Sequence, residues 1–149
     1  MNMTTKKALL LVGHGSKLPY SKEFMINILE KLKKKNIFSG NVYVGLMEFN
    51  HPTIPESLKE IISSGFKKII VLPVFLAHGT HTKKDIPKIL QLNNDIIENH
   101  EEIHSHHSHH IISNEKIEIP NDVEIIYKDP IGPHDKIIDI LLEKINSDM

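Results

Sequence analysis

The sequence predicts an α/β fold in which a four-stranded parallel sheet carries helices on both faces. Apolar runs bounded by turn residues alternate with segments of helical period, which is the pattern of strands joined by crossover helices. The apolar runs are nearly continuous, as expected for strands covered on both sides. A length of 149 residues, with 40% apolar and 25% charged residues, fits one domain spanning 1–149 that needs no cross-link for stability.

The first half of the chain contains two strand and helix pairs. The first strand holds the run ALLLV, and the helix after it has apolar residues three and four apart, with lysines near its end that suit the helix dipole. The second helix opens with Thr53-Ile54-Pro55-Glu56, the spacing of a capping box with proline in the first turn. The expected strands are 7–13 and 42–47, and the expected helices are 21–36 and 53–65.

The second half repeats the alternation around an insertion. Pro73 in the third strand predicts a bulge or the end of regular pairing. The last helix has one apolar stripe, formed by Ile137, Ile138, Leu141, Leu142 and Ile145. The expected strands are 69–75 and 123–127, and the expected helices are 85–94 and 135–145.

Residues 98–118 break every periodicity and are predicted to form a mobile insertion, because they are too polar to bury a core. This segment contains the tract HEEIHSHHSHH, whose imidazoles would bind nickel, cobalt or zinc. Two interpretations stay open, a dispensable surface loop and a reservoir that raises the local metal concentration. Its histidines are His100, His104, His106, His107, His109 and His110.

Composition excludes several classes of chemistry and points to metal. Cysteine is absent, which excludes disulfides, thiolate nucleophiles and thiolate metal sites and fits an intracellular, cytoplasmic location. A net charge of -1 and the lack of a long apolar run argue against nucleic acid and membrane partners. All 18 basic residues are lysine, so no guanidinium fork is present. The 11 histidines favour binding of a transition metal, because imidazole is a common ligand for such metals.

Groups that bind metals or protons follow every expected strand. In open parallel sheets, ligands bind at the carboxyl ends of the strands, so these groups should lie along one edge. His14 between two glycines is a poor core residue, whereas Glu48 serves equally well as a helix cap or as a functional group. His78 and His81 are three residues apart, a spacing compatible with metal and also common by chance, and His51 is expected to be an exposed loop residue. The strand-end groups are His14, Glu48, His78, His81, Asp129 and His134.

The turn Gly13-His14-Gly15-Ser16 does not match three better-known motifs. Its glycines have the wrong spacing for a dinucleotide fingerprint, and no Gly-Lys-Ser/Thr follows for a P-loop. Histidine phosphatases need an Arg-His-Gly motif, and arginine does not occur in this chain. Nucleotide binding and phosphoryl transfer therefore have little support.

Four ordered segments resemble one family over nearly the whole chain. They are VGHGSKLPYSKE at 12–23, GLMEFNHPTIPESL at 45–58, VLPVFLAHGTHTKKDIPKI at 71–89 and DVEIIYKDPIG at 122–132. Together they resemble the class II tetrapyrrole chelatases, and within them the small single-domain CbiX type of archaeal sirohydrochlorin chelatase. The chain departs from the family at Lys17 and Lys88, where the family often has arginine. Both lysines keep the positive charge of arginine but lack its planar, bidentate guanidinium group.

The resemblance implies a chelatase-like three-layer sandwich and the ATP-independent insertion of cobalt or nickel into sirohydrochlorin, for cobamide or nickel-tetrapyrrole coenzyme biosynthesis. The resemblance implies that His14 and His81 bind the metal. Carboxylate and imidazole both accept protons near neutral pH, so Glu48 is the preferred relay for pyrrole protons, with His81 as the alternative. No organic cofactor is implied, and the half-length chain suggests a homodimer. The expected substrate contacts are Gly13, Gly15, Ser16, Lys17, Glu48, Leu76, Ala77, His78, Gly79 and Thr80.

Two other functions stay open beside this one. An iron chelatase for siroheme would use the same residues. A non-catalytic metal storage or delivery protein would instead depend on the histidine tract and would be indifferent to His14. The glycines at 13, 15 and 79 are expected to let a large flat ligand approach the backbone.

Overall fold

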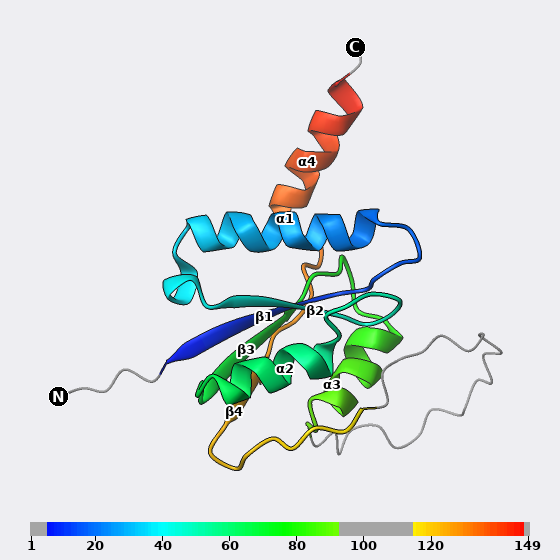
Figure 1. Cartoon of the computed structure of the whole chain (residues 1–149). Helices are drawn as coiled ribbons and strands as arrows, with labels where there is room; N and C mark the ends of the chain where they lie inside the picture. Colours follow the sequence, from blue (N-terminus) through cyan, green and yellow to red (C-terminus); the bar gives the residue numbers. More distant parts are fainter. Residues whose placement is uncertain (1–5, 93–114, 148–149) are drawn as a thin grey trace, which may run out of the picture.

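The structure, a computed structural model, describes residues 6–92 and 115–147 (Figure 1). The strands are β1 Lys7–Gly13, β2 Val42–Leu46, β3 Lys68–Pro73 and β4 Glu124–Tyr127. The helices are α1 Tyr20–Lys34, α2 Ile54–Ser63, α3 Ile86–Ile89 and α4 Asp135–Asn146, with a 3-10 helix η1 Ile37–Gly40 and a π-helical turn η2 His81–Asp85. The histidine tract lies outside the described residues.

The predicted sheet is confirmed. All pairings are parallel, and the strand order is β2-β1-β3-β4. β1 therefore lies inside the sheet, and six of its seven residues are buried, as its unbroken apolar run predicts. This order places the ends of β1, β2 and β3 next to one another at one edge.

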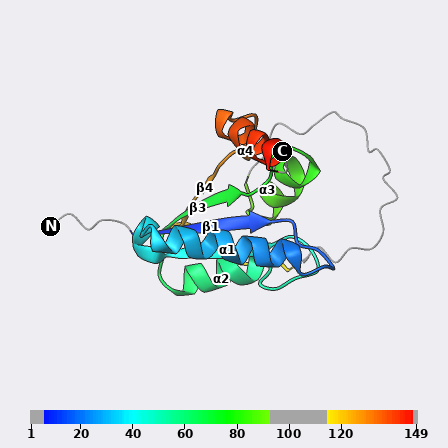
Figure 2. The same cartoon turned by 90° about the horizontal axis from the view of Figure 1, so that it is seen from above.

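Helices cover both faces of this sheet, as predicted (Figures 1 and 2). On one face, α2 and α3 pack against Leu10, Val12 and Val71 in the larger apolar cluster. On the other face, α1 packs against Leu9 and Leu11 in the smaller cluster. The alternating residues of one central strand thus hold both layers.

The capping signal before α2 is confirmed in detail. The backbone N–H of Glu56 donates to Thr53 Oγ1, and the backbone N–H of Thr53 donates to the Glu56 carboxylate. Pro73 is the last residue of β3, so it marks the end of the strand and not a bulge within it. In α1 the apolar spacing is correct, but Phe24 at the end of the stripe is 54% exposed.

The third helix differs from the expected span of 85–94. It begins with η2 at His81, and the α-helical part ends at Ile89. Gly79 and the polar residues around it hide the start of this helix in the sequence, because glycine typically marks a loop. Farther along, residues at the expected end of the insertion lie against the domain, where Ile117 is 6% exposed and its carbonyl accepts from Gln91 Nε2.

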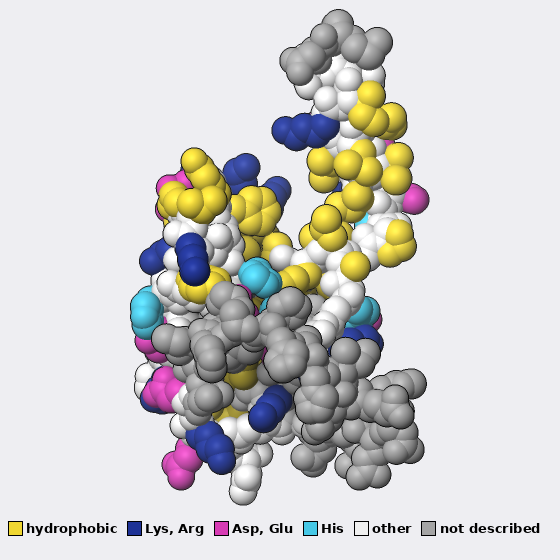
Figure 3. Space-filling model, turned by 90° about the vertical axis from the view of Figure 1, so that its right-hand side faces the viewer, with side chains coloured by type: hydrophobic (Ala, Val, Ile, Leu, Met, Phe, Trp, Pro, Cys, Tyr) yellow, Lys and Arg dark blue, Asp and Glu magenta, His cyan; other side chains and the backbone are white. Residues whose placement is uncertain are grey.

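The last helix forms where its sequence predicts, but α4 projects away from the sheet (Figure 1). None of its residues is buried, and apolar side chains are exposed along the projecting helix (Figure 3). Among the described residues, no helix has the length and apolar character needed to cross a membrane.

Candidate metal and substrate site

His14 follows β1 directly, in a turn whose two glycines are packed against the protein itself. A Cβ added at Gly13 would lie 2.7 Å from Met25 Cγ. One added at Gly15 would lie 1.9 Å from the carbonyl oxygen of Glu48, and the φ of Gly15 is +82°, a region that favours glycine. These two glycines therefore permit a close approach between parts of the chain itself.

Glu48 reaches the same place from the end of β2, and its backbone is held by the loop that carries His14. The backbone N–H of Glu48 donates to the carbonyl of His14 at 3.0 Å, so the two loops pair beyond the strands. Asn50 ties them further, because its Oδ1 accepts from the backbone N–H of Ser16 at 2.9 Å. Asn50 carries no signal in the sequence, since a single hydrogen bond between loops has no spacing rule.

His81 opens the π-helical turn η2 after β3. Its carbonyl accepts from the backbone N–H of Ile86, which closes the wide turn, and its ring Nδ1 lies 2.7 Å from Asp85 Oδ2. The hydroxyl of Tyr127 at the end of β4 donates to the carbonyl of Thr82 at 2.6 Å. Burial, followed by repulsion from Asp129, raises the pKa of Tyr127 to about 12. Single-turn π segments occur often at functional sites.

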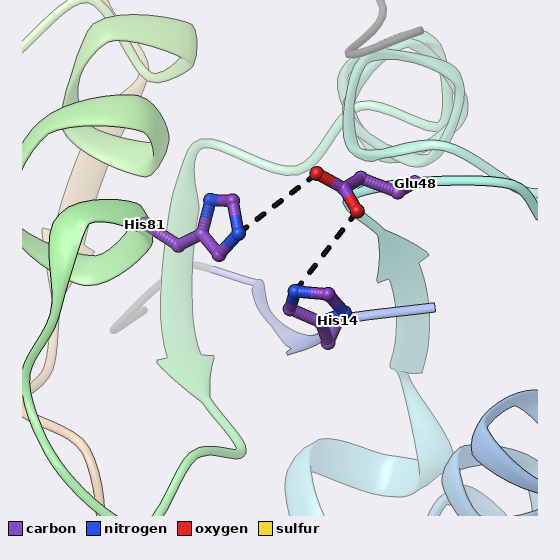
Figure 4. Close-up of side chains that lie close together, drawn as sticks. All are labelled: His14, Glu48 and His81. Carbon is purple, nitrogen blue, oxygen red and sulfur yellow. Dashed lines mark ion pairs between the residues drawn. The ribbon is translucent and has the colours of Figure 1, made fainter. Parts of the chain in front are cut away.

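These three elements bring His14, Glu48 and His81 together in one cluster, which we call the triad (Figure 4). The distance from His14 Nε2 to Glu48 Oε2 is 4.0 Å, and that from His81 Nε2 to Glu48 Oε1 is 3.9 Å. The two imidazole centroids are 4.9 Å apart, with their planes at 65°. Each residue offers a ligand atom within 4.8 Å of the other two. The sequence expectation that His14 and His81 lie close together is met.

The triad has the spacing of a metal site. The distances of about 4 Å are too long for hydrogen bonds, whereas atoms that bind one metal ion at about 2.0–2.2 Å lie roughly 3–4 Å apart. Glu48 is 8% exposed, so its carboxylate is largely removed from water and is paired here only with imidazoles among the described residues. A carboxylate and two imidazoles suit a divalent transition metal and leave coordination positions open.

His78 lies beside this site but has its own partners. Its Nε2 is 3.3 Å from Asp129 Oδ1, and its Nδ1 is 3.2 Å from Thr82 Oγ1. Thr82 is 1% exposed, and its hydroxyl also accepts from the backbone N–H of Gly79. This network joins the loop after β3 to the segment after β4, so we assign His78 to holding the loop and not to the triad.

Two further histidines have structural roles. His51 is exposed, as expected, and its Nδ1 lies 2.9 Å from Glu56 Oε1. The hydrogen bond to His51, with a second from Thr53, lowers the pKa of Glu56 below its ordinary value. His134 caps α4 by accepting from the backbone N–H of Lys136.

The remaining expected substrate contacts surround the triad on exposed loops. Lys17 Nζ stands 5.5 Å from the ring centroid of Phe49, which is 43% exposed. Leu76 is 67% exposed, and nothing in the described part of the chain lies within 4 Å of a Cβ added at Gly79. Ser16 is half-buried, and the exposed members are Lys17, Leu76, Ala77, His78, Gly79 and Thr80. The open side of the triad is therefore bordered by apolar, polar and cationic side chains.

Comparison with known sequences supports the family resemblance. A family model described as CbiX matches residues 8–148. A Methanocaldococcus jannaschii protein described as sirohydrochlorin cobaltochelatase is 55% identical over 142 residues, covering 93% of this chain and 96% of that protein. A Methanococcus aeolicus protein with the same description is 54% identical over 143 residues, with coverage of 93% and 96%.

Solved structures show the same fold. The chelatase SirB from Bacillus subtilis subspecies spizizenii, determined in complex with cobalt, has a TM-score of 0.70 at 23% identity, covering 96% of this chain and 51% of SirB. The chain thus spans about half the length of SirB. A CbiX protein from Marinobacter aquaeolei has a TM-score of 0.57 at 22% identity, with coverage of 95% and 96%. The chelatase-like fold that the motifs imply is confirmed, and the match over residues 8–148 places this chain in the CbiX family.

Proposed function

We propose that this chain inserts cobalt(II) into sirohydrochlorin. The observation that carries the proposal is the triad, two imidazoles and a largely buried carboxylate with metal spacing at the carboxyl edge of the sheet. Relatives between 50% and 55% identical, matched over at least 96% of their length, are described as sirohydrochlorin cobaltochelatases. As proposed, the reaction consumes only divalent metal and free tetrapyrrole, with no ATP and no organic cofactor.

The triad would hold the metal without enclosing it. His14, His81 and Glu48 occupy three positions, so water fills the others until the macrocycle nitrogens replace it. The side chain of His14 is 50% exposed, which leaves the ion accessible from the open side. A closed site of four protein ligands would bind the ion too well to pass it on.

Glu48 would also relay the protons that insertion releases. Entry of a divalent ion displaces two pyrrole protons, so the charge at the ring centre is unchanged. When cobalt leaves Glu48 for the ring, a free carboxylate remains beside the reacting nitrogens, where it would accept one proton, pass it to water, and then accept the other. His81, the alternative acceptor, already directs its Nδ1 to Asp85.

Lysines around the triad would bind the carboxylates of the tetrapyrrole. Lys17 lies on the loop that carries His14, Lys83 and Lys84 lie on the turn η2 that begins with His81, and Lys88 lies on α3 directly after it. All four lysines are exposed. Ammonium groups act as point charges, so they favour an acidic macrocycle without fixing its orientation as arginine would. Leu76 after β3 and the Phe49 ring after β2 supply exposed apolar surface.

The choice of metal follows the relatives and not the ligands. Imidazole and carboxylate bind copper more strongly than nickel or cobalt, so selectivity must come from metal supply and geometry. Nickel insertion for a nickel-tetrapyrrole coenzyme and iron insertion for siroheme are the alternatives to cobalt.

We propose further that the working form is a homodimer in which α4 of one copy covers the other. On α4, Ile138, Leu141 and Ile145 are 54%, 51% and 67% exposed. On the sheet, residues of β3 and β4 that face the α1 side, such as Leu72 and Ile126, are only half-buried, whereas Ile69 and Val71 on the opposite side are 0% exposed. The exposed apolar stripe of α4 in one copy could therefore cover the half-buried apolar strip on β3 and β4 of the other. The half-length relation to SirB agrees with two copies.

The proposed reaction is tested by anaerobic absorbance of sirohydrochlorin with Co²⁺, Ni²⁺ or Fe²⁺. We expect the wild type to accelerate cobalt insertion over the spontaneous rate, and His14→Ala and His81→Ala to lose the acceleration. His51→Ala is the matched control, because that histidine pairs with Glu56 outside the triad. No acceleration with any ion would contradict the chelatase.

Deletion of residues 99–114 separates the chelatase from a metal carrier. The chelatase keeps its turnover at saturating cobalt after the deletion, whereas a carrier loses its metal capacity and ignores His14→Ala. Unchanged turnover at limiting metal would also exclude the reservoir interpretation of the histidine tract.

A further inference from the structure

The two histidines of the triad both direct Nε2 toward Glu48, but their Nδ1 atoms have different hydrogen-bond acceptors. His14 Nδ1 lies 3.0 Å from the carbonyl oxygen of Gly15, and His81 Nδ1 lies 2.7 Å from Asp85 Oδ2. A carbonyl or carboxylate oxygen can only accept, so each Nδ1 carries the proton and each Nε2 is free for metal. His14 therefore depends on a neutral acceptor and His81 on a charged one.

This difference makes the two imidazoles unequal as ligands. A hydrogen bond to a carboxylate is shorter and about twice as strong as one to a neutral oxygen, and it raises the basicity of the imidazole that donates it. The side chains of His81 and Asp85 are 26% and 27% exposed, compared with 50% for His14. Water therefore competes less for the His81 pair than for His14.

The backbone around His81 reinforces the same arrangement. His81 and Asp85 lie four residues apart in one turn, so their side chains face each other without distortion of the loop. The carbonyl of Thr82 accepts from the Tyr127 hydroxyl, which ties that turn to β4. His14, by contrast, is in a turn where its ring contacts only the adjacent residue's carbonyl among the described hydrogen bonds.

We propose that Asp85 is a positioning residue that keeps the proton of His81 on Nδ1 and makes His81 the firmer imidazole ligand, so that the metal separates from His14 first during transfer. The metal part of this inference rests on the proposed function. The placement of the ring proton does not, since it concerns the protein without metal or tetrapyrrole.

The ring proton is tested by NMR of the metal-free full chain labelled with ¹⁵N in histidine, whose ring couplings distinguish a proton on Nδ1 from one on Nε2. We expect the Nδ1–H form for His81 in the wild type and in Asp85→Asn, which keeps an oxygen acceptor. Asp85→Leu removes the acceptor and should shift His81 toward the Nε2–H form that free imidazole side chains favour. Glu56→Gln is the matched control, since Glu56 pairs with His51 and should leave the His81 signals unchanged.

The inequality of the ligands is tested by cobalt titration without tetrapyrrole, using the chain lacking residues 99–114 so that the histidine tract does not contribute. Asp85→Leu should weaken cobalt binding by about 10- to 100-fold, as expected for loss of an outer partner of a metal-binding histidine. Asp85→Asn should cause a smaller loss. His81→Ala should lose more affinity than His14→Ala in the wild type, and the two losses should become equal in the Asp85→Leu background.

Two outcomes would overturn the inference. One is an Asp85→Leu variant that keeps the Nδ1–H form and binds cobalt within twofold of the wild type. The other is equal loss from His14→Ala and His81→Ala with Asp85 intact. If Asp85→Leu does not fold, Asp85→Asn decides, because a charged acceptor that matters cannot be replaced by a neutral one without loss. The wild type could fail to insert metal although its Nδ1–H form depends on Asp85. That result would contradict the proposed function and keep the positioning role of Asp85.

Discussion

Helices α1 and α4 have similar amphipathic patterns and opposite surroundings. In α1, Met25 is 2% exposed, and Ile28 and Leu32 pack against the sheet. In α4, no residue is buried, and Leu141 and Leu142 are 51% and 49% exposed. Figure 2 shows α1 lying along the sheet, whereas α4 stands beside the domain.

The difference shows that an apolar stripe predicts a helix and its contact face, but not the molecule that provides the contact. An amphipathic helix gains most of its stability from the surface it covers. For α1, that surface is its own sheet. For α4, the exposed stripe and the half-buried strip on β3 and β4 have the same chemistry, which is why we assign them to two copies of the chain.

The largest expected effect is on folding stability, where buried residues beneath α1 and exposed residues on α4 should differ most. Leu11 is 0% exposed beneath α1, so Leu11→Ala should lower the free energy of unfolding by about 2–5 kcal/mol. Leu141→Ala on α4 should lower it by less than about 0.5 kcal/mol at protein concentrations where the chain is monomeric. Urea unfolding at several protein concentrations measures both values.

The concentration dependence is the control for that result. If α4 packs on a second copy, the cost of Leu141→Ala should increase as the protein is concentrated, because association then contributes to stability. A cost above about 2 kcal/mol at every concentration would mean that α4 packs on its own domain, as α1 does.

The second effect is on association. Leu141→Lys combined with Ile145→Lys places two charges on the apolar stripe and should raise the dimer dissociation constant by at least about tenfold, or 1.4 kcal/mol. Glu143→Lys on the opposite side of α4 changes the net charge by the same amount and should have little effect. Sedimentation equilibrium compares the three proteins, and a wild type that stays monomeric at every concentration would contradict the homodimer.

Much of the fold follows from the sequence because local signals and burial agree there. The run in β1 predicts a strand inside the sheet, and Thr53 with Glu56 predicts the start of α2 at the correct residue. The beginning of the third helix was not predictable, because a π-helical turn has no period of its own in five residues. The exposure of α4 was not predictable either, since a stripe carries no information on its partner.

The same limit applies to the candidate site. His14, Glu48 and His81 are identifiable as strand-end groups, because parallel strands deliver their carboxyl ends to one edge. Asp85 and Asn50 act through single hydrogen bonds to these groups or to their loops, and such contacts depend on distances that spacing alone does not define. His78 follows β3 as His81 does, and only the structure shows that it pairs with Asp129.

The third prediction concerns β4, whose end is tied to the turn that carries His81. Tyr127→Phe removes the hydrogen bond to Thr82 and should lower the free energy of unfolding by about 1 kcal/mol near pH 8. The pKa of Tyr127 is raised from 10.0 to about 12, so the neutral form is favoured in the folded chain. Its contribution is therefore complete below pH 10 and is lost as the pH rises from 10 to 12.

The difference between wild type and Tyr127→Phe isolates this contribution, because every lysine titrates equally in both proteins. The difference should fall steadily as the pH rises from 10 to 12. A difference that stays constant from pH 8 to 12 would mean that ionisation of the hydroxyl is no harder in the folded chain than in the unfolded chain.

The smallest expected effect on stability is at the start of α2, where the structure matches the capping box that the sequence predicts. Glu56 accepts hydrogen bonds from His51 and from the backbone of Thr53, and these lower its pKa below 4.5. A lowered pKa means that the contribution to stability is present above pH 4.5 and is lost as the pH falls below it. Because Glu56 is 41% exposed, Glu56→Gln should cost less than about 1 kcal/mol at pH 7, and the cost should vanish in acid. Thermal unfolding of both proteins from pH 7 to pH 3 measures this, and a cost independent of pH would assign the effect to the shape of the side chain and not to its charge.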